Sequence, residues 1–170
     1  MVIGLLWLFL TLFLFIVENH WFLFFPGSQS PDLLLLLLVV YALDQGARRG
    51  TFYGLGAGLL LDIVTFSYFG WHAITRGCIG FLVGHNRQNM FADRLVTYEI
   101  LIGMLTLLLQ VARGLFLCLA LGRWLPFFPL ALLTFKTLFW NLVTGPVVWV
   151  AYRKMKPKVQ RRLDYYYHVE

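Results

Sequence analysis

The chain has 170 residues, of which 60% are hydrophobic and 13% are charged, with a mean hydropathy of +0.75 and a formal net charge of +6. Soluble domains usually carry about 25% charged residues, so the composition excludes an ordinary water-soluble domain and disfavours nucleic-acid binding. Because about 20 apolar residues span a bilayer, the chain has room for about six transmembrane helices. We expect an all-α transmembrane domain over residues 1–152 and a short basic cytoplasmic tail over 153–170.

The apolar segments and the residues between them predict six helices. Their approximate ranges are 2–17 (with a continuation as far as 25), 33–43, 51–66, 71–83, 95–121 and 129–152. The first has no basic segment before it and no cleavage site after it, which predicts an uncleaved helix. Ser30-Pro31-Asp32 opens the second helix with a capping serine, a proline at the first helical position and an acid in the first turn. Pro146 predicts a kink in the last helix.

The basic residues of the loops predict the orientation, because short cytoplasmic loops are rich in Lys and Arg. With the N-terminus inside, ten of the fourteen basic residues are cytoplasmic and only Arg123 is in an outer loop. The ten are Arg48, Arg49, Arg87, Arg94, Arg153, Lys154, Lys156, Lys158, Arg161 and Arg162. We therefore expect both termini inside. Arg153, Lys154, Lys156 and Lys158 would also contact anionic lipid of the inner leaflet.

Four ionisable residues fall inside the predicted helices, namely Asp62, Arg76, Arg113 and Lys136. Charges within spans are costly and usually face a partner or a wet cavity. At about 1.5 Å of rise per residue, all four lie at a similar depth in the outer half of the membrane. One interpretation of this polar layer is an outward-opening pocket for a lipid phosphate, an undecaprenyl-linked precursor or an acidic side chain. The alternative is that Arg113 and Lys136 extend their side chains to the outer interface.

Glycines recur every four residues on two consecutive helices. Gly50, Gly54 and Gly58 lead to Asp62, and His72 and Arg76 lead to Gly80 and Gly84. Small residues at this spacing let helix backbones approach closely. We predict that the two faces pack as an antiparallel hairpin and that Asp62 pairs with Arg76. In the alternative, the glycines serve packing alone and Arg76 extends outward.

The remaining polar residues predict no chemistry of their own. Gln110 and Asn141 are expected to hydrogen-bond between helices. Cys78 and Cys118 lie in apolar runs and predict small core residues without a disulfide. The four histidines have no metal-ligand spacing, and no phosphate-binding loop, nucleophile elbow or zinc motif is present. We expect no enzymatic activity and no cofactor.

The segment from Pro31 to Gly84, about a third of the chain, resembles the bacterial rod shape-determining protein family MreD. The segments that carry the resemblance are Pro31-Asp32-Leu33 with the apolar run to Tyr41, Gly50 and Gly54, Gly58-Leu59-Leu60-Leu61-Asp62, and Phe69-Gly70-Trp71-His72-Ala73. The other helices match only in hydropathy and number. Pro31, Asp32, Gly54, Gly58, Asp62, Gly70 and His72 are the motif positions.

The resemblance implies a non-enzymatic multi-pass scaffold in the bacterial inner membrane that supports lateral peptidoglycan synthesis and rod shape. Its implied partners are the transmembrane helix of MreC and, directly or through it, MreB, RodA and a class B penicillin-binding protein. The implied fold is similar to the substrate-binding subunits of energy-coupling-factor transporters. A rival interpretation is a membrane subunit that binds a transported small molecule, or a lipid or precursor, in the polar layer.

Overall fold

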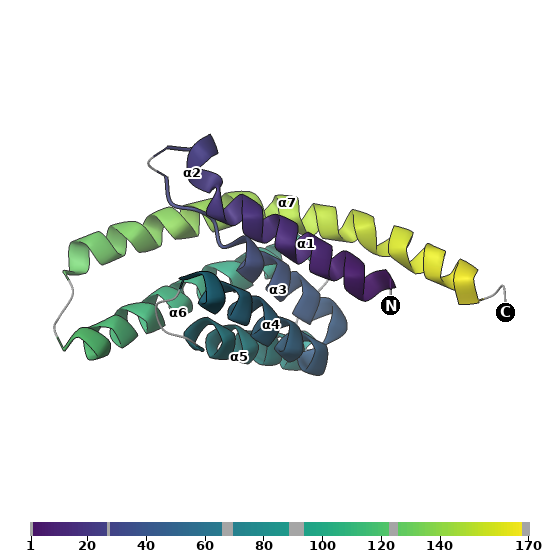
Figure 1. Cartoon of the computed structure of the whole chain (residues 1–170), viewed down its shortest axis with the longest axis horizontal. Coiled ribbons are helices and arrows are strands. Elements are labelled where there is room, and N and C mark those ends of the chain that lie inside the picture. The colour runs from purple at the N-terminus through teal and green to yellow at the C-terminus, as the bar shows by residue number, and fades with distance from the viewer. Residues whose placement is uncertain (1, 27, 66–69, 89–93, 123–125, 168–170) are drawn as a thin grey trace.

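The computed structural model describes the backbone of residues 2–26, 28–65, 70–88, 94–122 and 126–167, and their side chains except at 2–6, 8, 22, 127 and 156–167. Within these residues all regular structure is helical (Figure 1). The elements are α1 (Val2–Asn19), α2 (Trp21–Phe24), α3 (Leu33–Gln45), α4 (Ala47–Thr65), α5 (Trp71–His85), the 3₁₀-helix η1 (Asn86–Gln88), α6 (Leu95–Leu121) and α7 (Phe127–Tyr167).

The six predicted helices correspond to α1 and to α3 through α7, and α6 has the predicted bounds. The additional α2 is a single turn in the segment where the first helix was allowed to continue. The predicted turns include residues 66–69, 89–93 and 123–125, which lie outside the described residues. The start of α1 and the end of α7 lie at the same end of the molecule (Figure 1).

The loop expected between the second and third helices is almost absent. α3 ends at Gln45 and α4 begins at Ala47, four residues earlier than predicted. Gly46 alone connects them, with φ 87° and ψ −178°. This backbone region is essentially restricted to glycine, so one residue reverses the chain. Arg48 and Arg49 therefore lie in the first turn of a helix.

α3 is the central helix of the molecule. It contacts α1, α4, α5, α6 and α7, and its residues from Leu33 to Val40 are all buried. The predicted range was right, but the predicted cap was wrong. Asp32, and not Ser30, is the N-cap, and its Oδ1 accepts a hydrogen bond of 2.8 Å from the Leu35 N–H. A helix that is apolar on every side is expected to be surrounded by other elements.

The glycine-bearing faces of α4 and α5 pack against each other, as the sequence predicted. A Cβ atom added at Gly54 would overlap the carbonyl oxygen of Arg76, and one at Gly58 would overlap the backbone of His72 and Ala73. At the other end of the hairpin, Gly50 and Gly80 face each other in the same way. The two backbones are therefore as close as the absence of side chains allows.

α6 and α7 extend beyond the ends of α4 and α5, at the end opposite the termini (Figure 1). By length and composition, α6 and residues 128–155 of α7 can cross a membrane. Only 28% and 17% of their most apolar stretches are buried. α7 is bowed in Figure 1, and its helix continues through Pro146 and through the predicted tail to Tyr167.

Hydrogen bonds near the end that holds the termini fix α7 and η1 to α3. The hydroxyl of Tyr152 on α7 donates to the Asp44 carboxylate at 2.7 Å. Arg87 of η1 donates from Nη1 to the Asp44 carbonyl oxygen at 2.9 Å. The end of α3 is thus held by residues from two later segments.

Candidate functional site

Asp32 is the centre of a polar cluster at the start of α3. Besides capping the helix, its carboxylate accepts two hydrogen bonds of 2.8 Å from Nη2 of Arg76 on α5. Its backbone N–H donates to Oδ1 of Asn141 on α7 at 2.7 Å. The Arg76 side chain is only 4% exposed. Asp32 therefore connects α3, α5 and α7 and neutralises a buried cation.

The predicted pair of Asp62 with Arg76 is wrong. Asp62 is 1% exposed, and its carboxylate accepts from the backbone N–H groups of Gly70, His72 and Ala73 at 3.0–3.1 Å. The first N–H groups of a helix have no partner within the helix, and Gly70, the N-cap of α5, has no side chain to supply one. Asp62 thus acts as the cap of α5 from the neighbouring helix. Asp62 and Arg76 have a similar predicted depth, but the partners of the Asp62 carboxylate are the backbone N–H groups at the start of α5.

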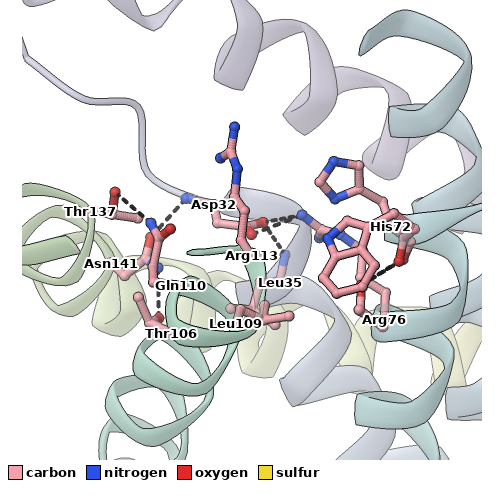
Figure 2. A pocket seen from close by; sticks show the side chains of 12 residues that line it. Asp32, Leu35, His72, Arg76, Thr106, Leu109, Gln110, Arg113, Thr137 and Asn141 are labelled. Carbon is pink, nitrogen blue, oxygen red and sulfur yellow. Dashed lines mark hydrogen bonds and ion pairs between the residues drawn. The ribbon is translucent and has the colours of Figure 1, made fainter. Parts of the chain in front are cut away.

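A pocket with about 70 Å³ of space lies beside the Asp32–Arg76 pair (Figure 2). It is formed by α5, α6 and α7 together with the start of α3. Its lining residues are Asp32, Leu35, Trp71, His72, Thr75, Arg76, Thr106, Leu109, Gln110, Arg113, Thr137 and Asn141. Most of them are polar, which is unusual for a site beside apolar helices and identifies this region as the candidate site.

The amides in the pocket wall join α6 to α7. Gln110 Nε2 donates to Oγ1 of Thr137 at 3.2 Å, and Asn141 Nδ2 donates to Oγ1 of Thr106 at 2.9 Å. The predicted interhelical hydrogen bonds of Gln110 and Asn141 are therefore confirmed. The two threonines were not predicted as partners, because threonine in an apolar helix usually bonds within its own helix.

The predicted polar layer divides into three environments. Arg76 and Arg113 both line the pocket, Asp62 caps α5, and Lys136 is exposed and does not line the pocket. Arg113 is also exposed, and its guanidinium points away from the Asp32–Arg76 pair (Figure 2). Among the described residues, no hydrogen-bond acceptor or ion-pair partner is found for Arg113 or Lys136.

Most of the motif positions have a structural role. Pro31 is fully buried, Gly54 and Gly58 are at the α4–α5 contact, and Gly70 has φ 94°, which favours glycine. His72 is half-buried and lines the pocket. The pairing of Asp32 with Arg76 was not predicted from the sequence.

The contact of Glu18 with the start of α3 was not predicted, and the basic segment is described only in part. Glu18 of α1 accepts from the Leu34 N–H at 3.2 Å and adds a second carboxylate at the start of α3. In the basic segment, Arg153 and Lys154 are exposed. The side chains of Lys156 and Lys158 lie outside the described residues.

The described side chains include no group of three residues able to hold a metal ion. The cationic and amide donors of the pocket are instead suited to bind an anionic or polar group. Fold and site together define a helical protein with two helices of membrane-spanning character and a polar pocket between them and the start of α3 and α5.

The chain belongs to the family of the rod shape-determining protein MreD, whose family model matches residues 1–156. The resemblance noted from the sequence is therefore confirmed, and it extends well beyond the segment from Pro31 to Gly84 that carried it. The family is one of membrane proteins that determine cell shape and is not known for enzymatic activity. No curated protein and no solved structure matches the chain.

Proposed function

We propose that this protein is a non-enzymatic scaffold of the bacterial inner membrane that supports lateral peptidoglycan synthesis by binding the transmembrane helix of MreC. Membership of the shape-determining family carries the proposal. Through MreC, or directly, the scaffold would act with MreB, RodA and a class B penicillin-binding protein. Its task would be to fix the position of the extracytoplasmic part of MreC.

The exposed apolar surface supports a location within lipid. Large apolar side chains on the outer faces of α6 and α7 are more than half exposed, among them Met104, Leu108, Phe135 and Val147. Surface of this extent would drive a water-soluble protein to aggregate, whereas lipid solvates it. In our proposal α1 and α3–α7 make six passes, with both termini and the basic segment around Arg153 in the cytoplasm.

Two exposed helix faces carry a small residue with open space above it. On α4, Gly56 lies between exposed Phe52 and Ile63. On α6, Gly103 lies beside exposed Met104, and here too an added Cβ would meet no atom of the described chain within 4 Å. Helices in membranes associate through such small residues because the backbones can then approach closely. We place the MreC helix on one of these two faces.

Co-purification of MreC from solubilised membranes tests the proposal. A bulky substitution on the face that MreC uses, either Gly56→Leu or Gly103→Leu, should abolish co-purification, and the other variant is its matched control. Loss of the protein should also make a rod-shaped host round. If neither substitution affects co-purification, MreC does not use these faces. If a host without any paralogue remains rod-shaped when the protein is deleted, the scaffold role is wrong.

The pocket favours a second candidate, a membrane subunit that binds a small molecule for transport. The similarity to substrate-binding subunits of energy-coupling-factor transporters remains a proposal of the same kind. A companion ATPase and a bound small molecule would support the transporter. Stoichiometric co-purification with a single-pass partner would support the scaffold.

A further inference from the structure

The pocket lies at the base of an outward extension of α6 and α7. Arg113 precedes the end of α6 at Leu121 by eight residues, which is about 12 Å of helix. The segments beyond it are apolar and exposed, with Leu119 at 84% and Phe128 at 76% exposure. If this apolar surface is within lipid, the shorter helices α3 and α5, which begin beside the pocket, do not reach the outer membrane surface. A polar pocket at that depth lies beside an apolar wall.

The pocket has more positive charge than its own acid neutralises. Asp32 is already occupied by Arg76 Nη2 and by the Leu35 N–H. Nη1 of Arg76 is buried and has no hydrogen-bond acceptor among the described residues. Arg113 adds a second guanidinium with no counter-ion among them. The nearby Glu18 carboxylate faces the Leu34 N–H and is not among the residues that line the pocket.

Hydrogen-bond donors other than the arginines also line the space. The ring of His72 and the amide of Gln110 contribute N–H groups to the wall, whereas the Thr75 hydroxyl, which also lines it, donates to the Trp71 carbonyl oxygen at 2.8 Å. Trp71 closes one side and stacks on Phe116 of α6, with ring centroids 4.2 Å apart. A guanidinium group with neutral N–H donors is suited to recognise a phosphate group. Arg113 offers the exposed guanidinium here, and the aromatic and leucine surface of the pocket is suited to acyl chains.

We infer that this pocket binds the phosphate group of an anionic lipid-like molecule, with Arg113 as the main contact and the acyl chains along the exposed surface of α6 and α7. The site is separate from the glycine faces proposed for MreC and does not depend on the scaffold function. Free inorganic phosphate has the same headgroup chemistry, but it lacks the part that would contact the apolar wall.

Binding to purified protein in a neutral detergent tests the inference, with native mass spectrometry as the measurement. The probes are dioctanoyl phosphatidic acid, dioctanoylglycerol with the same chains but no phosphate, and inorganic phosphate. We expect binding of phosphatidic acid alone. Arg113→Gln should weaken this binding at least tenfold, which corresponds to about 1.4 kcal/mol. Lys136→Gln, which removes an exposed cation outside the pocket, should leave it unchanged.

Arg113 is exposed and unpaired among the described residues, so Arg113→Gln should retain the fold, and its unfolding temperature checks this. Equal loss of binding in Lys136→Gln would mean that general surface charge attracts the lipid, and would overturn the inference. Equal binding of dioctanoylglycerol would show that the phosphate group is not recognised, and would also overturn the inference. Binding of inorganic phosphate as strong as that of phosphatidic acid would show that the acyl chains do not contribute, and that the ligand is not a lipid.

Discussion

Arg76 on α5 donates from one nitrogen, Nη2, to both carboxylate oxygens of Asp32, which lies 44 residues earlier in the chain. Asp32 also caps α3, so the start of the central helix and the second helix of the glycine hairpin share one carboxylate. The family motif and the polar layer meet at this pair.

Removal of the charge of Asp32 should destabilise the protein. In Asp32→Asn, asparagine can still cap α3, but the buried Arg76 loses its counter-ion, so we expect a loss of about 3–5 kcal/mol in unfolding free energy. The double variant Asp32→Asn with Arg76→Gln should recover part of the loss. Unfolding in detergent measures this, and the exposed Arg48→Gln is the control. Strict additivity of the single changes would show that the pair is not coupled.

Asp62→Ala should loosen the start of α5 through a different mechanism. Three backbone N–H groups would lose their acceptor, and each unsatisfied buried donor costs about 1–3 kcal/mol. We expect a total of about 3 kcal/mol or more, with faster amide hydrogen exchange in the first turn of α5. The coupling of Asp62 to Arg76 in a double-mutant cycle should be smaller than that of Asp32 to Arg76. A larger coupling would restore the pair that the sequence suggested.

The glycine contact between α4 and α5 allows a comparison within one helix. Gly54→Ala should destabilise by about 1–3 kcal/mol, because its methyl group would overlap the carbonyl oxygen of Arg76. Gly56→Ala, two residues away, would place its methyl group in open space. It should be neutral or stabilising by up to about 1 kcal/mol through helix propensity. Similar unfolding temperatures for both variants would contradict the close packing.

The proposed orientation is tested by cysteine labelling of intact cells, in a background where Cys78 and Cys118 are replaced by serine. Gln88→Cys in η1 should resist a membrane-impermeant reagent until the cells are opened, because the basic residues place this segment in the cytoplasm. His20→Cys, at the other end of α1, should label from outside. Labelling of Gln88→Cys in intact cells would reverse the topology.

The sequence determined the elements of this protein because its signals are local. Long apolar runs set the bounds of α6 and the core of α3, and glycines at four-residue spacing determined which faces of α4 and α5 meet. These features depend on composition and helical period, which are properties of the chain itself. The amide contacts of Gln110 and Asn141 followed from the cost of leaving such groups unpaired in an apolar setting.

Only the tertiary structure decided the partners of the charged residues. Depth along a helix placed Asp62 level with Arg76, but depth does not give the direction in which a side chain points or the competing donors nearby. The free N–H groups at the start of α5 bind Asp62, and Arg76 is left to Asp32 from the central helix. Whether Arg113 and Lys136 share a site likewise depends on helix rotation. Rotation is set by how α6 and α7 pack against α3 and α5, which hydropathy cannot specify because both helices are apolar on most sides.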